Sequence, residues 1–570
     1  MQGTLLLGLT LAAFTAVMLG GLRILFFQLS KLQIPPGVDQ PGRYRLAPEN
    51  KPPAQYEDCL TAAIHFMRNS EDYAVDPTRI ITAGDSAGAY LAAIVTQTLS
   101  MSKGRGFFLK ATVSEAYRLA PEHKPPAQYE DCLTAAIHFM RKPEDYGVDP
   151  TRIITAGDSA GAYLAATVTQ TLSMFVASFI LLVLGTIQFE ISNTEIPPGM
   201  DQPIKLRIIH GFLVGSAVLG KILERMGLCS QLNFVRCIRY GKKPGMDPKL
   251  FVKDLNFETV PVRVYQPRAS SSGQRRGIVF FHGGGWVFGD LDSHEKLCRY
   301  IARESESVVA SVEYRLAPEH KYPAQFDDCL TAAIHFMRNT EDYGVDPTRI
   351  IIAGDSAGGH LAALVSQAVV SRPGLPKPRA QVLIYPFVQG LDFNLPSYLQ
   401  NCKVPLLFRE RVPFFALLCL NGDVSVLEDV LEGTHIPTDI KLKYKKWLSL
   451  DNIPEEFKVR GYKPQLFIEC KKEVYEQVKE ICEPTFSPLL AEDAIFCQLP
   501  ESFILTCEYD VLRDDGLLYK KRLEDSGVQV TWYHVEDGFH GVISMFDNGI
   551  LSFPAGKKAL DKIINFLRGL

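Results

Sequence analysis

Short apolar runs alternate with longer amphipathic stretches throughout the C-terminal two-thirds of the chain. The runs are rich in Val and Ile and end at glycine, proline or charged residues, as buried strands do. Between two of them, residues 324–339 carry apolar side chains at helical spacing, and so does the stretch after Ser356. Strands that alternate with helices predict a mostly parallel sheet covered on both faces. The predicted strands are 277–281, 307–314, 349–354, 380–386, 503–507 and 528–534.

The N-terminal part contains two long uncharged segments. Residues 1–22 hold no charged side chain and are rich in Leu, Ala, Val and Phe. At a rise of about 1.5 Å per residue, a helix of this length crosses a bilayer core of about 30 Å. We therefore predict a membrane anchor, and a cleaved signal peptide is the alternative, although a basic start and a clear cleavage site are missing. Residues 174–189 are a candidate second anchor.

One segment occurs three times, at residues 44–101, 117–174 and 314–371. Each copy opens with YRLAPE and contains GDSAG, and the first two differ at five of 58 aligned positions. The copies are unevenly spaced, which argues against a repeat array with regular stacking. We interpret 44–174 as two partial duplicates of a catalytic core segment and 193–570 as the complete domain.

The pentapeptide Gly354-Asp355-Ser356-Ala357-Gly358 fits the G-x-S-x-G nucleophile elbow. In this motif a strand turns sharply into a helix and lifts the serine hydroxyl above the sheet. Glycines flank the serine because the turn leaves no room for side chains. The match alone is weak, but an apolar run precedes it and a helical pattern follows it. Ser356 is the predicted nucleophile.

A glycine run, His282-Gly283-Gly284-Gly285-Trp286, follows another predicted strand upstream of the elbow. Acyl transfer creates an oxyanion, which backbone N–H groups in such a run can stabilise. A plain glycine turn is the alternative, but this motif and the elbow together are typical of esterases and lipases. We predict that the N–H groups of Gly283, Gly284 and Ala357 form the oxyanion hole.

A serine nucleophile needs a histidine base, which in turn needs a carboxylate to orient it. In this kind of fold the acid and then the histidine follow the serine along the chain. Asp510 lies just beyond the strand at 503–507, and His540 lies in a loop after the strand at 528–534. Both are the predicted triad partners of Ser356. Asp514 and Asp515 compete with Asp510, but they sit where a helix would start and are expected to cap it.

Composition excludes some other functions. The formal net charge is -4, and basic runs, RNA-binding signatures and zinc-spaced Cys and His residues are missing from the sequence. Nucleic acid is therefore not an expected partner. Serine acyl transfer also needs no cofactor and no metal ion, so we expect neither.

Residues 193–570 resemble the arylacetamide deacetylase-like proteins of the hormone-sensitive lipase group of α/β hydrolases. The matching motifs are HGGGW at 282, YRLAPEH at 314, GDSAGG at 354, YDVLRDDG at 509 and DGFHG at 537. The resemblance implies an eight-stranded sheet, a cap from residues 204–240 and 387–465, and hydrolysis of apolar carboxylic esters or acetyl amides. It also implies the endoplasmic reticulum membrane. By the same resemblance the catalytic residues fall on Ser356, Asp510 and His540.

Ser86 and Ser159 occupy the same pentapeptide in the two duplicates. Neither duplicate contains its own HGGG, acid and histidine, so we predict that both serines are catalytically silent. Two other functions are compatible with this organisation: a ligand-binding protein without activity on the same fold, and a membrane scaffold built from the repeats. The complete set of triad residues favours the enzyme.

Overall fold

The computed structural model describes residues 192–570 except 201, 226, 240–244, 246, 461 and 463–468, together with residues 185 and 188. The described residues belong to one compact unit. The predicted anchor at 1–22 and the predicted duplicates at 44–174 lie outside them. The candidate anchor at 174–189 also lies outside, apart from residues 185 and 188.

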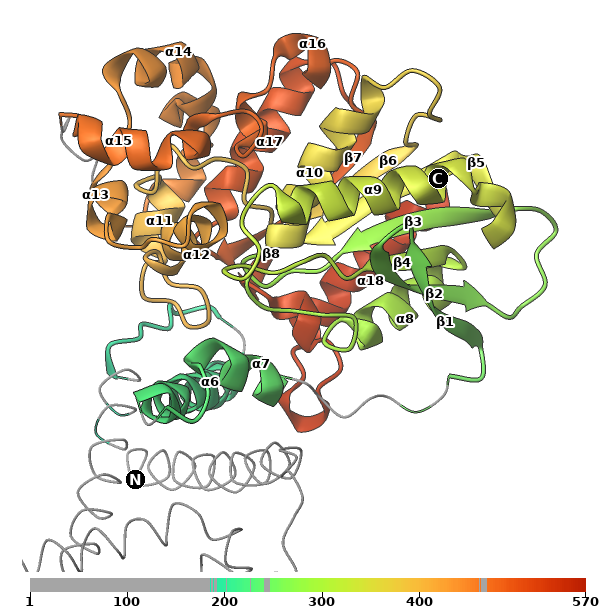
Figure 1. Ribbon diagram of the computed structural model, residues 1–570, viewed down its shortest axis with the longest axis horizontal. Coiled ribbons are helices and arrows are strands. Elements are labelled where there is room, and N and C mark those ends of the chain that lie inside the picture. Colours follow the sequence, from blue (N-terminus) through green and yellow to red (C-terminus); the bar gives the residue numbers. More distant parts are fainter. Residues whose placement is uncertain are drawn as a thin grey trace, which may run out of the picture. The chain divides into compact units, whose positions relative to one another are not determined.

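An eight-stranded sheet forms the centre of this unit, in the order β1-β2-β4-β3-β5-β6-β7-β8 (Figure 1). All neighbouring strands are parallel except for β2, which is antiparallel to both β1 and β4. This confirms the predicted α/β-hydrolase sheet. The strands are β1 (Leu250–Phe257), β2 (Val260–Pro267), β3 (Arg275–Phe281), β4 (Val308–Val312), β5 (Val345–Asp355), β6 (Ala380–Ile384), β7 (Glu501–Tyr509) and β8 (Val530–Phe539).

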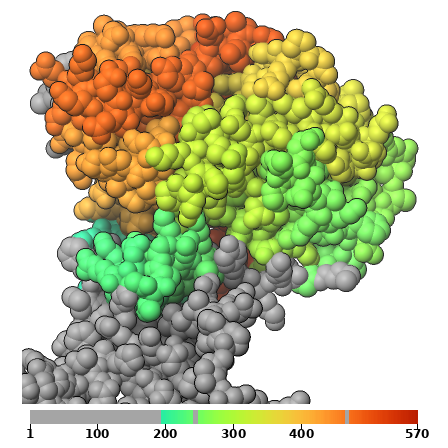
Figure 2. Space-filling model, in the orientation of Figure 1, coloured from blue at the N-terminus to red at the C-terminus, as the bar shows by residue number. Residues whose placement is uncertain are grey.

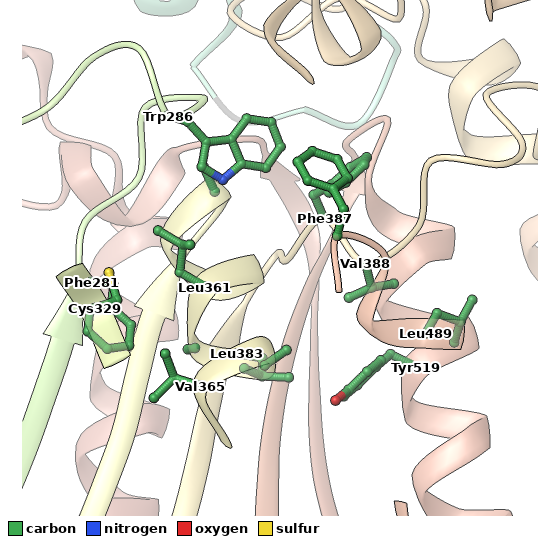
Figure 3. Close-up of a cluster of buried hydrophobic side chains, with 14 of the residues drawn as sticks. Phe281, Trp286, Cys329, Leu361, Val365, Leu383, Phe387, Val388, Leu489 and Tyr519 are labelled. Atoms are coloured by element: carbon green, nitrogen blue, oxygen red, sulfur yellow. The ribbon is translucent and has the colours of Figure 1, made fainter. Parts of the chain in front are cut away.

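Two helical layers cover the sheet because successive side chains of a strand point to opposite faces. In β3, Val279 and Phe281 join one core cluster, and Ile278 and Phe280 join the other. Figure 3 shows part of the first cluster, where Leu361 and Val365 of a helix face the sheet residue Leu383. The first face is covered by α9 (Ala324–Arg338), α10 (Ala357–Val370) and α17 (Arg513–Asp525), and the second by α8 (Glu295–Ser305) and α18 (Pro554–Gly569).

A helical cap is inserted between β6 and β7. Its helices gather beside one end of the sheet and form a continuous mass there (Figures 1 and 2, orange). The cap was expected from residues 387–465, and the insertion extends further along the chain, to α16. The cap helices are α11 (Pro396–Gln400), α12 (Arg411–Leu420), α13 (Leu427–Glu432), α14 (Thr438–Leu448), α15 (Lys472–Val478) and α16 (Asp493–Phe496).

Short 3-10 helices occur in the cap, between the sheet and its helices, and near the C-terminus. They are Thr340–Tyr343, Leu450–Asn452, Glu455–Phe457, Lys479–Cys482, Pro488–Leu490, Val542–Met545 and Gly549–Leu551.

Two further helices, α6 (Pro203–Arg225) and α7 (Gln231–Arg239), precede the sheet in the chain. The Arg236 guanidinium of α7 donates hydrogen bonds to the carbonyls of Val287 and Ala317, at 2.9 and 2.7 Å. It also forms an ion pair with Glu319 at 2.8 Å. These contacts hold α7 against two loops, the one that follows the glycine run and the one between β4 and α9.

Of the described helices, α6 alone is long and apolar enough to cross a membrane. Its most apolar 18-residue window is 39% buried inside the protein. Length and composition therefore allow α6 to contact a membrane, although a helix packed in a protein core meets the same criteria. This segment is not one of the predicted anchors, and it was expected to belong to the cap.

Candidate active site

The turn between β5 and α10 carries Ser356. Its backbone has φ 54 and ψ -121, in a region that non-glycine residues rarely occupy. A Cβ on Gly354 would lie 2.2 Å from the Gly358 carbonyl oxygen, and a Cβ on Gly358 would lie 2.0 Å from that of Phe281. Glycine is thus required on both sides of the serine. The Ser356 N–H donates to the Ile384 carbonyl at 2.9 Å, which fixes the turn at the end of β6.

The structure brings the three predicted triad residues together. Ser356 Oγ lies 2.8 Å from His540 Nε2, and His540 Nδ1 lies 2.8 Å from Asp510 Oδ2. Asp510 is buried, and its other carboxylate oxygen accepts the Leu512 N–H at 2.9 Å. The Tyr385 ring packs against the imidazole, with 4.8 Å between ring centroids. The serine hydroxyl therefore has a base within hydrogen-bond reach, and the base has an orienting carboxylate.

Asp514 and Asp515, the competing carboxylates, do not reach His540. They were expected to cap α17, and this expectation is wrong because their carboxyl groups accept from groups outside that helix instead. Both point instead toward the start of the cap, where Ser397 N–H donates to Asp514 at 2.6 Å and Val388 N–H donates to Asp515 at 3.1 Å. Buried backbone amides need an acceptor, and these two carboxylates supply it.

Asp515 makes stability depend on pH. Burial raises the pKa of Asp515 from 3.8 to about 8. From about pH 4 to about pH 8, the folded protein keeps a proton that the unfolded chain has lost, so this contribution to the free energy of unfolding declines as pH rises.

Asp515→Asn cannot lose a proton, so we expect a flatter pH dependence of the free energy of unfolding. Urea titrations across this range check it. The exposed Asp525 of the same helix, changed to Asn, is the control, and equal slopes for wild type and Asp515→Asn would contradict the prediction.

The glycine run departs from expectation at its first glycine. The Gly283 N–H donates to Asp355 Oδ1 at 2.8 Å, so the expectation that it binds the oxyanion is wrong. Within the part of the chain that the structure describes, the N–H groups of Gly284, Gly285 and Ala357 have no acceptor. For Ala357 this follows from its place in the first turn of α10. These three amides are therefore available, and Gly285 was missed by the sequence reasoning.

Asp355 is a second residue that the sequence reasoning missed. It is buried beside Ser356, and its carboxylate lies 3.4 Å from His294 Nε2 as well as bonding to Gly283. Burial acts to raise the pKa of Asp355, but His294 and the Gly283 N–H outweigh it and hold that pKa below its ordinary value. The charged carboxylate ties the glycine run to the elbow. Asp355 occupies the first of the two variable positions of the G-x-S-x-G motif, so its charge beside the serine was the one signal available.

Two buried histidines, His282 and His360, support the two ends of the glycine run. His282 stacks on Tyr314, and the Tyr314 hydroxyl donates to the His282 carbonyl at 2.7 Å. Trp286 Nε1–H donates to His360 Nδ1 at 3.2 Å, and His360 Nε2–H donates to the Phe486 carbonyl at 2.6 Å. Burial lowers the pKa of His282 to about 3 and that of His360 to about 4. Both are neutral at physiological pH and serve as structural supports.

This chain is similar to a known protein family and to several characterised proteins. The α/β hydrolase fold family matches residues 42–111, 109–186, 278–431 and 460–544. Human arylacetamide deacetylase-like 4 is 48% identical over 378 residues, which cover 66% of this chain and 93% of that protein. Rat neutral cholesterol ester hydrolase 1 is 35% identical over 387 residues, covering 65% and 94%. A solved carboxyl esterase 2 from Tuber melanosporum is 26% identical, with a TM-score of 0.43 and coverage of 57% and 89%.

The fold, the nucleophile-elbow geometry and these relatives define an α/β hydrolase that acts on carboxylic esters. Within this class, the chain belongs to the arylacetamide deacetylase-like proteins. The relatives match over nearly their whole length, but they cover only about two-thirds of this chain. The family also matches the repeated segments near the N-terminus.

Proposed function

We propose that Ser356, His540 and Asp510 hydrolyse carboxylic esters through an acyl-enzyme. The unbroken chain of 2.8 Å contacts from the serine hydroxyl through the imidazole to the carboxylate carries this proposal. Ser356 Oγ attacks the ester carbonyl while His540 Nε2 takes its proton. The alcohol then leaves with that proton. Water, activated by the same nitrogen, adds to the acyl carbon and releases the acid and the free serine.

The oxyanion formed at each step is stabilised by the N–H groups of Gly284, Gly285 and Ala357. The support is that these amides have no acceptor among the described residues, whereas the Gly283 N–H is used by Asp355. Donors held in place before the reaction are worth roughly 3–4 kcal/mol each in serine hydrolases.

The substrates are apolar carboxylic esters or acetyl amides. Related proteins are named arylacetamide deacetylase and neutral cholesterol ester hydrolase. Two partly exposed residues beside Gly284 and Gly285, Phe288 and Phe415, are apolar. Hydrolysis of p-nitrophenyl esters and of an aryl acetamide by the purified full-length chain tests this class. Turnover of charged esters in preference to apolar ones would contradict it.

The protein resides in the endoplasmic reticulum membrane, with its anchor within residues 1–22. The uncharged N-terminal segment and the family resemblance support this location. Alkaline carbonate extraction of microsomes should leave the full-length chain in the membrane pellet. Release of the chain into the supernatant would contradict the proposal.

The duplicated serines, Ser86 and Ser159, are silent, and the sequence offers a physical reason. In the complete domain the elbow continues with Gly359 and His360, whereas both duplicates have Ala-Tyr at these places. A Cβ on Gly359 would lie 3.1 Å from the Pro386 side chain, and His360 is buried with both ring nitrogens hydrogen-bonded. Tyrosine is larger and offers no ring nitrogen to accept from Trp286.

A fluorophosphonate probe tests the assignment. We expect peptide mapping of the labelled full-length chain to find the phosphonate on Ser356 alone, because a serine without a positioned base does not react. Denatured protein, which should not label, is the control. Label on Ser86 or Ser159 would contradict the prediction for the duplicates, and an unlabelled Ser356 would contradict the proposed mechanism.

A further inference from the structure

Two phenylalanines, Phe415 and Phe288, lie beside Gly285 and Gly284 of the proposed oxyanion hole. Gly285 has φ +63, and a Cβ built on it would lie 2.8 Å from Cδ2 and 2.9 Å from Cγ of Phe415. The Phe415 ring therefore covers this side of Gly285. Phe415 comes from α12 of the cap, more than a hundred residues further along the chain, so the cap itself reaches the oxyanion loop.

The second member of the pair is Phe288. The N–H groups of Val287 and Phe288 donate to the Gly284 carbonyl at 3.2 and 2.9 Å, which folds the chain back on itself. A Cβ on Gly284 would consequently lie 2.2 Å from the Phe288 carbonyl oxygen. The rings of Phe288 and Phe415 meet edge to face, with centroids 5.8 Å apart and an interplanar angle of 90°. This is a favoured geometry for aromatic pairs.

The helix α12 holds Phe415 firmly while leaving its ring partly open. Val412, Ala416 and Leu417 are buried in the core, whereas Phe414, Phe415 and Leu418 are half-exposed. The half-exposed positions follow the spacing of one helical face. The exposed Arg411 begins this face of the helix. From Phe414 onward the face is apolar, and it contacts Gly285 of the glycine run through Phe415, so this part is a surface suited to hydrocarbon.

The chemistry decides which part of an ester this surface would meet. The leaving alcohol oxygen must take a proton from His540 Nε2, so the alcohol group lies toward the imidazole. The carbonyl oxygen lies toward the amides of Gly284, Gly285 and Ala357. The acyl group takes the remaining side, away from the imidazole.

We propose that Phe415, backed by Phe288, is the wall that limits the length of the acyl group accepted by the enzyme. The proposal rests on the proposed function of Ser356 and deepens it. With the ring in place, short acyl groups fit between the elbow and α12. Without it, the space occupied by the ring opens to longer chains along the apolar face of α12.

Acyl selectivity of Phe415→Ala tests the proposal. The kcat/KM values for p-nitrophenyl acetate, butyrate and octanoate are measured on the full-length chain. We expect the ratio of octanoate to acetate to rise by about tenfold or more, since methylene groups in a fitted pocket change selectivity by that order. The readout is the ratio rather than acetate turnover alone, because the Phe415 ring also covers Gly285 of the oxyanion loop. Phe415→Trp should shift the ratio in the opposite direction.

The matched control is Phe414→Ala, which removes the same side chain from the neighbouring position of the same helix. Its ring contacts Phe415, with centroids 5.6 Å apart, but it is not among the nearest groups to Gly285. We expect it to shift the ratio much less than Phe415→Ala does, because the Phe414 ring does not lie against Gly285. An equal shift from Phe414→Ala, or a uniform loss on all esters from Phe415→Ala, would overturn the proposal.

An alcohol series with a fixed acetyl group completes the experiment. Unchanged alcohol preference in Phe415→Ala supports the acyl assignment, and a change confined to the alcohol series overturns it. Wild-type turnover separates the two levels of inference. If wild type hydrolyses none of the esters and Ser356 does not label with fluorophosphonate, the proposed function has failed. If wild type is active and the ratio does not respond, the assignment of Phe415 has failed.

Discussion

Ser356→Ala is expected to lower kcat for an apolar ester on the order of a millionfold, the size of the loss when the nucleophile of a serine protease is removed. The alanine removes the only oxygen placed 2.8 Å from His540 Nε2 among the described residues. Substrate binding should change little, because the oxyanion amides and the cap stay in place. Steady-state rates with a p-nitrophenyl ester give kcat and KM separately.

Controls for this variant come from the chain itself. Ser86→Ala and Ser159→Ala remove the equivalent serine of each duplicate and should leave kcat unaltered. We expect Ser356→Ala to fold, because alanine at this strained turn is sterically close to serine. Circular dichroism and thermal unfolding check that it does. Near-normal turnover in folded Ser356→Ala would exclude this residue as the nucleophile.

Asp510→Asn is expected to lower kcat by about four orders of magnitude. The buried carboxylate accepts both the His540 Nδ1–H, at 2.8 Å, and the Leu512 N–H, at 2.9 Å. An amide at this position can keep only one acceptor. If the amide group turns its NH2 toward the imidazole, His540 takes the tautomer with the proton on Nε2 and can no longer accept the serine proton.

The control for Asp510→Asn is Asp515→Asn, the same change at a buried carboxylate five residues away. Asp515 binds the Val388 N–H and the Gln389 side chain rather than His540. We expect Asp515→Asn to lose some stability but to keep kcat far above that of Asp510→Asn. Comparable losses of kcat in both variants, measured where both are folded, would mean that Asp510 acts only by holding the structure together.

The sequence predicted six of the eight strands but not β1 and β2, the first two strands along the chain. The six predicted runs correspond to β3 through β8. The strands β3 to β7 lie inside the sheet and contain nearly continuous apolar runs. The edge strand β8 is less buried, and its β-branched and aromatic residues mark it as a strand. The strand β1 is at an edge, and its mostly exposed middle carries charged residues, so its pattern resembles that of a loop. The strand β2 lies inside the sheet, but its two prolines and the buried Arg263 interrupt its apolar pattern.

The triad was predictable because its residues follow motifs at the ends of strands, and the structure brings these three side chains into contact. The oxyanion donors were less predictable. Three successive glycines look alike in a sequence, and the choice among them depends on where each N–H points. The Gly283 N–H points to Asp355, a partner 72 residues away that no local pattern indicates.

The hydrogen bond between Asp355 and Gly283 limits which segments of this enzyme can be duplicated or transferred with their function intact. The pentapeptide supplies the Asp355 carboxylate, and the glycine run, 72 residues upstream, supplies the Gly283 N–H that binds it. The duplicates at 44–101 and 117–174 repeat the pentapeptide but not the glycine run, so each carries the aspartate without the amide that it binds in the complete domain. An active site of this kind therefore has to be transferred together with both the pentapeptide and the glycine run.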